Sequence, residues 1–162
     1  MSPTVFLALQ GVTLLYAFVG GVFLAFSDFI MRSLSRTGGS GGMEAMQVIN
    51  REVFRWVFMV SFLGLAVVSL ALIPLGSFAI AGPAGTFTAL AGTVYLFGCF
   101  GVTVLRNVPL NERLAGMDRV EPTAQAFWTD TYLTRWTLWN TVRTMACALA
   151  ATSLMAALSL AS

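Results

Sequence analysis

The sequence of 162 residues contains no histidine and no lysine, and only 10% of its residues are charged. Histidine is the commonest general base and a frequent metal ligand, so its absence removes both roles in their usual form. The two cysteines, Cys99 and Cys147, lie in apolar stretches and form no CxxC pair, which argues against a thiol redox centre or a zinc site. We therefore expect no dedicated site for a metal or a haem, and we interpret both cysteines as small buried hydrophobes.

The low charge also separates this chain from soluble domains, in which about 25% of residues are charged. Hydrophobic residues make up 57% of the chain, and nine arginines against seven acidic residues leave a net charge of +2. So mild a positive charge does not indicate nucleic-acid binding. The composition predicts an integral membrane protein, with the lipid bilayer as its first partner and a single domain over residues 1–162.

Four apolar runs are long enough to cross a bilayer, which requires about 20 residues in a helix. An amphipathic segment, 43–56, precedes the second run, and a polar connection, 112–125, precedes the fourth. We predict an all-α fold, namely a four-helix integral membrane bundle with an extra amphipathic helix before its second span. The expected spans are residues 4–26, 57–75, 84–105 and 139–160.

Two places near the ends of predicted spans are expected to differ from a regular apolar helix. Asp28 and Arg32 are four residues apart with the acid first, which is the better order for an ion pair along one helix. Pro109 disfavours helical backbone at the residue before it, so a break is expected there, with Asn107 and Asn111 on either side. These two asparagines would either cap the broken helix or hydrogen-bond a ligand.

The charged side chains are confined to two parts of the sequence. All sixteen lie either between Asp28 and Arg55 or between Arg106 and Arg143. Both arginine-bearing connections therefore share one side, which the positive-inside rule makes cytoplasmic, with both termini outside, as in a bacterial-type inner membrane. Polar residues from four separate segments then converge on one end of the bundle. An interfacial belt does not require this convergence, so a functional site there stands as an equal alternative to the belt.

The clearest candidate for such a site lies near the start of the fourth span. At about 100° per residue, a helix places Tyr132, Trp136, Trp139, Asn140 and Arg143 within one arc. One interpretation is an aromatic belt at the membrane interface, with an arginine that snorkels to the headgroups. The other is a polar site inside the bundle, in which the guanidinium reaches inward and bonds to amide side chains.

Four short motifs occur in order along the chain. They are Phe26-Ser27-x-Phe29-Ile30-Met31, Gly42-x-x-Ala45-Met46-Gln47-x-Ile49-Asn50, Asn107-Val108-Pro109-Leu110-Asn111 and Trp136-x-x-Trp139-Asn140-x-x-Arg143-Thr144. As a set, they resemble the anthrone oxygenase-like family of integral membrane proteins, and the resemblance covers nearly the whole chain. It implies a four-span membrane protein similar to enzymes that oxidise polyketide anthrones to anthraquinones with molecular oxygen and no added cofactor.

The chemistry that this resemblance implies can be matched to residues. An anthrone loses a methylene proton to give an enolate that reacts with oxygen, which requires a base, an oxyanion holder and a flat apolar slot. Thr141 stands where the family often has histidine, so the candidate base is Asp28, at a position usually small or neutral in the family, or Glu52. The candidate oxyanion holder is Arg143, with Asn140 or Asn107. The candidate substrate-binding residues are Arg32, Asn50, Asn107, Asn111, Tyr132, Trp136 and Trp139, of which the aromatic three would stack on the rings.

A second hypothesis belongs to another class of protein. The chain would then be a non-catalytic bundle that binds a hydrophobic small molecule or serves as a subunit of a membrane assembly. Under either hypothesis a homo-oligomer is compatible with the sequence. A transporter is less favoured, because no span carries a central charge pair or an inverted-repeat pattern. A deep pocket at the charged end, lined by tryptophan and amide groups, would favour the oxygenase.

Overall fold

The computed structural model describes residues 1–53 and 57–161, and within these ranges the chain forms helices and no β-strand. The predicted all-α class is confirmed. In chain order the elements are α1 (Pro3–Ala25), the π-helical turn η1 (Phe26–Ile30), α2 (Met31–Leu34), α3 (Gly41–Glu52), α4 (Val57–Pro74), η2 (Leu75–Ala79), α5 (Gly82–Val94), η3 (Tyr95–Gly101), η4 (Thr103–Asn107), α6 (Val108–Ala115), α7 (Pro122–Ala126), η5 (Phe127–Tyr132) and α8 (Leu133–Ala161).

These elements join into four helices that are long and apolar enough to cross a membrane: Pro3–Leu34, Val57–Ala79, Gly82–Ala115 and Pro122–Ala161. The predicted four-span membrane bundle is therefore confirmed. The fourth helix has 40 residues, which at about 1.5 Å per residue extends roughly 60 Å, twice the thickness of a bilayer's hydrocarbon core. A large part of the bundle must therefore project beyond the hydrocarbon.

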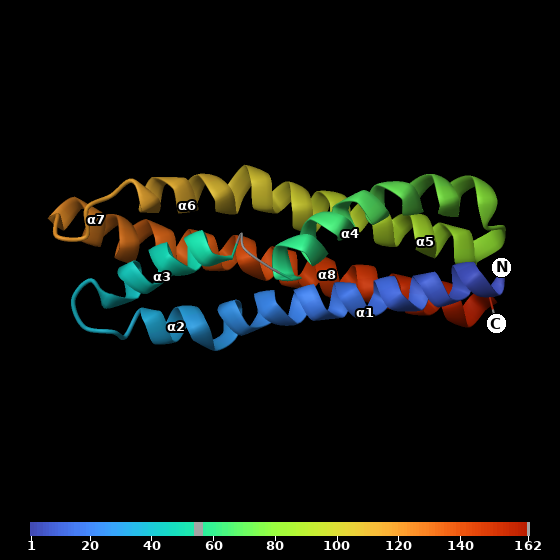
Figure 1. The fold of residues 1–162 in the computed structure, drawn as a ribbon, viewed down its shortest axis with the longest axis horizontal. Helices are drawn as coiled ribbons and strands as arrows, with labels where there is room; N and C mark the ends of the chain where they lie inside the picture. Colours follow the sequence, from blue (N-terminus) through green and yellow to red (C-terminus); the bar gives the residue numbers. More distant parts are fainter. Residues whose placement is uncertain (54–56, 162) are drawn as a thin grey trace.

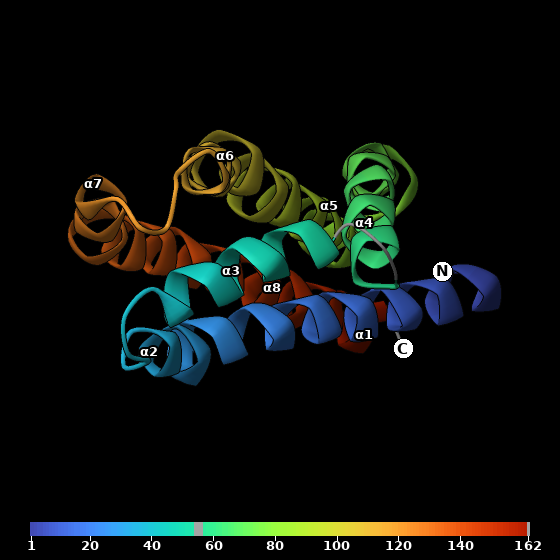
Figure 2. The ribbon, with the colours of Figure 1, turned by 60° about the vertical axis from the view of Figure 1, so that its left-hand side comes forward.

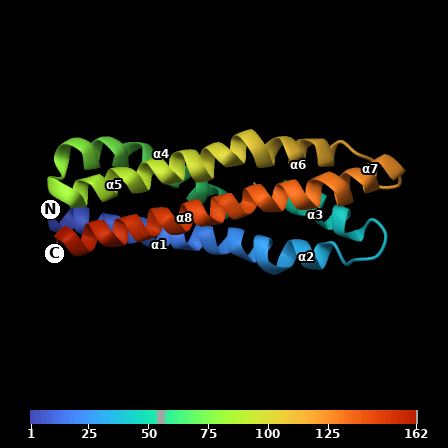
Figure 3. The same ribbon diagram turned by 180° about the vertical axis from the view of Figure 1, so that it is seen from behind.

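The four helices run along one another in an elongated bundle (Figure 1). The two termini and the turn between α4 and α5 gather at one end, and the α2–α3 and α6–α7 connections lie at the other. Seen from behind, the helix from α5 to α6 lies alongside α8 over its whole length (Figure 3). The charged segments thus share one end, as expected, while the side of the membrane that this end faces stays a prediction.

The projecting part of the bundle lies at the charged end. Within the four long helices, the exposed large hydrophobic side chains run as far as Phe29, Leu105 and Leu138, and begin at Val57 in the second helix. We call the belt of exposed hydrophobic side chains up to these four residues the apolar band. Beyond it, α3 lies between α2 and α6 and contacts both, in the place that a full-length second helix would occupy (Figure 2).

The expected helix break at Pro109 is not present. Val108 has helical backbone angles (φ −59°, ψ −48°), and the helix continues from η4 directly into α6. The N–H of Val108 bonds to the carbonyl of Thr103, five residues back, instead of the usual four. This wider turn makes room for the proline ring, which in a regular α-helix clashes with the carbonyl four residues earlier.

The expected Asp28–Arg32 ion pair is also not formed among the described residues, and both side chains are exposed. Asp28 lies inside the π-helical turn η1, whose wider turn shifts residues four apart away from their usual alignment. The amphipathic helix predicted over residues 43–56 is observed as α3, which ends at Glu52. The remainder of that prediction, residues 54–56, lies outside the described residues.

Two clusters of buried side chains hold the bundle together, one on each side of the edge of the apolar band. The larger contains Tyr16, Tyr95, Cys99 and Cys147 and packs the four helices within the band. The smaller contains Met46, Trp128, Tyr132 and Trp136, among others, and packs α3 and α6 against the start of the fourth helix. The candidate site lies between these two clusters.

Candidate functional site

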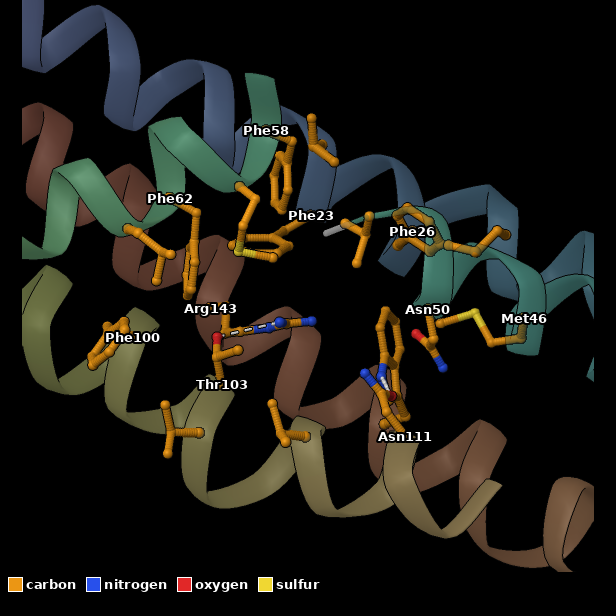
Figure 4. Close-up of a pocket in the computed structure, with 18 residues that line it drawn as sticks. Phe23, Phe26, Met46, Asn50, Phe58, Phe62, Phe100, Thr103, Asn111 and Arg143 are labelled. Atoms are coloured by element: carbon orange, nitrogen blue, oxygen red, sulfur yellow. Dashed lines mark hydrogen bonds between the residues drawn. The ribbon is translucent and has the colours of Figure 1, made fainter. Parts of the chain in front are cut away.

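A cavity of about 330 Å³ opens where α3 gives way to α4, at the edge of the apolar band (Figure 4). This volume is at the lower end of the range of small-molecule sites, roughly 300–1,000 Å³. All four long helices and α3 contribute to it. Its described lining residues are Val22, Phe23, Phe26, Met46, Ile49, Asn50, Val53, Phe58, Met59, Phe62, Leu63, Phe100, Thr103, Val104, Val108, Asn111, Trp136 and Arg143.

Arg143 is the only charged residue among the described residues that line this pocket. Its side chain is 5% exposed, so it points into the bundle and does not snorkel. Nη2 donates to Oδ1 of Asn140 at 2.6 Å, and Nη1 donates to the hydroxyl of Thr103 at 3.3 Å. Nε has no partner among the described residues. The guanidinium therefore has donor capacity left for a ligand.

Aromatic rings lie against the guanidinium of Arg143, and no carboxylate within residues 1–53 and 57–161 pairs with it. Its guanidinium carbon lies 4.1 Å from the centre of the Phe23 ring and 5.3 Å from that of Trp136. Such contacts stabilise a buried cation by about 2 kcal/mol or somewhat more. This is less than the several kcal/mol that removing a charge from water costs, so an anion in the pocket would be strongly favoured.

Asn140 holds the guanidinium in place. It is fully buried, and its Nδ2 donates to the carbonyl of Phe23 at 2.6 Å and to the hydroxyl of Ser27 at 2.7 Å. Its Oδ1 is thereby turned toward Arg143. These bonds connect α8 to α1 and η1, so the first and fourth helices together set the position of the cation.

A second polar group lies at the other end of the pocket, on the charged side. Asn111 Oδ1 accepts hydrogen bonds from the hydroxyl of Tyr132 and from Nε1 of Trp136, both at 2.8 Å. Asn50 donates to the same hydroxyl at 3.3 Å. Tyr132 in turn stacks between Trp128 and Trp136, with ring centres 5.3 and 6.2 Å apart. This network joins α3, α6 and the fourth helix.

Five of the ten predicted site residues therefore lie around the cavity or at its polar end. These five are Asn50, Asn111, Tyr132, Trp136 and Arg143. A sixth, Asn140, bonds to Arg143 without lining the cavity. Asn107 is buried close by, where its Nδ2 bonds to the carbonyl of Trp136 at 3.2 Å and its Oδ1 has no described partner, but it does not line the pocket.

The other predicted residues lie elsewhere. Asp28 is exposed and outside the pocket, and so is Glu52, the alternative base. Arg32 lines a separate groove on the surface between α2 and α8. Trp139 does not line the cavity, and the guanidinium of Arg106 lies over its ring, 4.9 Å from the ring centre. The roles predicted for these residues are not tested by their positions alone.

Most of the aromatic wall was not predicted from the sequence. Phe58 and Phe62 stack almost parallel, 9° apart with ring centres 6.2 Å from each other, and Phe23 meets both edge-on. Thr103, which bonds to the guanidinium, was also missed. A phenylalanine in an apolar span has no sequence signal that separates an inward from a lipid-facing position, because the whole helix surface is apolar.

The lining residues also limit the chemistry available. None of those described is an acid, so no carboxylate faces the pocket from residues 1–53 or 57–161. Over the same ranges, no three His, Cys, Asp or Glu side chains gather closely enough to hold a metal ion. The described side chains thus provide one cation, amide and hydroxyl groups, and aromatic rings.

Fold and site together define a class: a four-span membrane bundle whose ligand-sized apolar pocket holds one buried cation at the edge of the bilayer. The model of the anthrone oxygenase family matches residues 53–153, more than half of the chain. The chain belongs to this family, as its motifs predicted. No curated protein and no solved structure matches it.

Proposed function

We propose that this protein is a membrane-bound oxygenase that binds the anion of a flat phenolic polycycle, of the anthrone type, and allows it to react with molecular oxygen. The observation that carries the proposal is the buried guanidinium of Arg143, which faces an apolar pocket without a described carboxylate partner. A buried charge is costly when it is unpaired, so the pocket should prefer a ligand that brings the opposite charge. Membership of the anthrone oxygenase family supports this class of substrate.

The first step is ionisation of the substrate. An anthrone has a methylene group opposite its carbonyl, and loss of one methylene proton places a negative charge on the carbonyl oxygen. Two unit charges about 4 Å apart in a partly buried site attract by roughly 4 kcal/mol, which would lower the pKa of the bound substrate by about three units. The free Nε–H and the remaining Nη protons of Arg143 are the donors that would hold this oxygen.

The second step is reaction with oxygen. The ring carbon that lost its proton donates an electron to O₂, and recombination forms a carbon–oxygen bond and a hydroperoxide. Cleavage of the O–O bond with loss of water leaves a second carbonyl, which makes the product a quinone. One O₂ is consumed and one water released for each substrate, and the electrons come from the substrate anion, so the proposal requires no cofactor.

The pocket walls suit a flat ring system. Phe58 and Phe62 offer a stacked pair on one side (Figure 4). Trp136, on the fourth helix, also lines the cavity. Aromatic rings pack well against such surfaces in offset or edge-on arrangements. Asn50 and Asn111, at the other end of the pocket, would bond to hydroxyl groups on the far edge of the substrate.

The proton acceptor is the part of the mechanism for which the described lining residues offer no side chain. A general base must reach the proton that it removes, within about 3 Å or through one water. Asp28 and Glu52 do not line the pocket, so we assign the proton to water at the charged end, where the bundle projects beyond the hydrocarbon. The cation lowers the pKa of the bound substrate, so no protein base is needed.

Oxygen consumption by the purified protein tests this proposal. With anthrone or 1,8-dihydroxyanthrone, we expect one anthraquinone formed per O₂ consumed, well above the rate with heat-denatured protein. Arg143→Met should lower kcat/KM by about 100-fold or more, in line with the loss of an oxyanion donor. Arg106→Met is the matched control, because Arg106 lies outside the pocket, and it should retain near-normal activity. Equal rates for wild type and Arg143→Met would contradict the proposal.

The absence of an acid among the described lining residues also favours a second candidate, a bundle that binds an aromatic anion without converting it. This protein would bind the product quinone or a hydroxylated analogue through Arg143 and show no oxygen consumption above background. Binding measured by tryptophan fluorescence, together with the oxygen electrode, separates the two. Binding that depends on Arg143 without turnover would leave only the second candidate.

A further inference from the structure

A second cavity, separate from the pocket, lies on the outer surface of the bundle. It has a volume of about 490 Å³ and runs between η1 and α2 on one side and α8 on the other. We call it the Arg32 groove. Its described lining residues are Ser27, Met31, Arg32, Ser35, Leu133, Thr134, Thr137, Leu138 and Thr141, so five hydroxyl groups surround one guanidinium.

We propose that the Arg32 groove binds the phosphate of an anionic phospholipid. The position of the groove is the first argument. Leu138 and Phe29, at the edge of the apolar band, are 58% and 56% exposed. Arg32 comes three residues after Phe29, on the charged side, which is the depth at which headgroup phosphates lie above the hydrocarbon. Acyl chains of a bound lipid would run down past Leu138.

The second argument is the set of unused donors. The guanidinium of Arg32 makes no hydrogen bond or ion pair with any described residue, although its carbonyl accepts from the hydroxyl of Ser35. The hydroxyls of Thr134 and Thr137 likewise have no partner within residues 1–53 and 57–161. In contrast, Thr141 bonds back to the carbonyl of Thr137 at 2.9 Å, as helical threonines commonly do. A guanidinium fork and two free hydroxyls on facing helices match the several acceptor oxygens of a phosphodiester.

The third argument is charge. No acidic residue is among the described lining residues of the groove, and Asp28, one turn before Arg32 on the same helix, forms no ion pair with it. Basic grooves between membrane helices at headgroup depth are known to bind anionic lipids. A soluble phosphate would gain the same polar contacts but none of the apolar contact below them, which is why we assign the groove to a lipid.

Native mass spectrometry of the delipidated protein in a neutral detergent tests this assignment. Palmitoyl-oleoyl-phosphatidylglycerol should bind with one tight site, and palmitoyl-oleoyl-phosphatidylcholine more weakly. Arg32→Ala should weaken the phosphatidylglycerol site by roughly fivefold to tenfold. Arg135→Ala is the matched control, since this exposed arginine on α8 does not line the groove, and the change should be under about twofold.

Three results would overturn the proposal. Equal weakening by Arg32→Ala and Arg135→Ala would indicate surface charge without a site. Displacement of the lipid by excess inorganic phosphate would indicate a site for soluble anions. Equal affinity for both lipids would remove the preference for an anionic headgroup. If Arg32→Ala fails to fold, the double variant Thr134→Val/Thr137→Val should still weaken binding by about threefold with an unchanged melting temperature. These readouts are independent of oxygen consumption, so they do not depend on the proposed function.

Discussion

Nη2 of Arg143 lies 2.6 Å from Oδ1 of Asn140, three residues earlier on the same helix, and this bond aims the only charge found in the described pocket lining. This bond fixes the orientation of the guanidinium in addition to its electrostatic attraction. Asn140 is itself fixed by its two bonds to the first helix, so the guanidinium cannot turn toward the headgroups without breaking that contact.

Replacement of Arg143 by lysine should be nearly as harmful as replacement by alanine. Lysine keeps the charge but loses the planar fork that bonds to Asn140 and Thr103 at the same time. We expect both variants to melt at lower temperature than wild type and to bind an aromatic anion at least about tenfold more weakly. Thermal unfolding, monitored by circular dichroism, measures the melting temperature. Fluorescence titration measures the affinity for the aromatic anion. A lysine variant that behaves like wild type would mean that the fork is not needed.

Asn111→Leu should destabilise the charged end of the bundle. It leaves the Tyr132 hydroxyl and Trp136 Nε1 without their common acceptor, and each buried donor left unpaired costs about 1–3 kcal/mol. Hydrogen exchange should speed up in α3 and η5 more than in α5. Asn50→Leu is the control, because its 3.3 Å bond to the same hydroxyl is longer, and its loss leaves that hydroxyl still donating to Asn111. Equal effects of Asn111→Leu and Asn50→Leu would mean that the bonds to Asn111 stabilise the charged end no more than the bond from Asn50.

Two glycine-to-alanine changes should have opposite signs. A Cβ on Gly92 would lie 2.5 Å from the carbonyl oxygen of Ser69, so helices α4 and α5 would have to separate, at a cost of about 1–3 kcal/mol. A Cβ on Gly21 meets nothing within 4 Å, and alanine there should stabilise the helix by about 0.5–1 kcal/mol. Unfolding in a graded series of denaturing detergent measures both. Unchanged stability of Gly92→Ala would show that α4 and α5 pack less tightly at this position.

The membrane orientation can be tested with single cysteines in a background lacking Cys99 and Cys147. Cysteines at Ser40 and Gly116, in the two charged connections, should be shielded from an impermeant thiol reagent in intact cells. A cysteine at Ser77, exposed at the opposite end, should react. Permeabilised cells provide the control, in which all three positions should react. Labelling of Ser40→Cys or Gly116→Cys from outside would reverse the predicted orientation.

Purified protein washed with a chelator should contain no stoichiometric iron, copper or zinc. Without histidine, a transition metal would have to depend on scattered carboxylates, which are poor ligands for copper and zinc compared with imidazole or thiolate. Elemental analysis by inductively coupled plasma mass spectrometry measures this directly. One mole of any of these metals per mole of protein would contradict the prediction.

The four spans and the inward Arg143 could be predicted because each has a strong and local signal. Apolar runs of sufficient length identify the spans, and the three-residue spacing of Asn140 and Arg143 places them on one face of a helix. Residues that act through distant neighbours have no such signal. Phe23 and Phe62 face the pocket only because of how the first and second helices pack, and nothing in their local sequence distinguishes them from exposed Phe18 or Phe97.

The wrong expectations share one physical cause, the π-helical turns. A wide turn absorbs Pro109 without a break and shifts Asp28 away from Arg32, yet it requires no particular residue type that the sequence would reveal. The helices therefore continue further than their apolar runs. The candidate bases, Asp28 and Glu52, rest on the family pattern and on an expected partial burial, and neither of these indicates which side chains face a cavity.

The close approach of α4 and α5 determines which wall of the pocket is able to move. Gly76, Gly85 and Gly92 let the two backbones touch, so this hairpin can open only by losing many contacts at once. On the opposite wall, α3 is held by polar contacts as well as by the packing of Met43 and Met46: Gln47 donates to the carbonyls of Leu114 and Met117, and Glu44 pairs with Arg119. Entry and exit of a ligand should therefore be controlled from the α3 side, and the rate of release should follow the strength of the Gln47 contacts more than the packing of the hairpin.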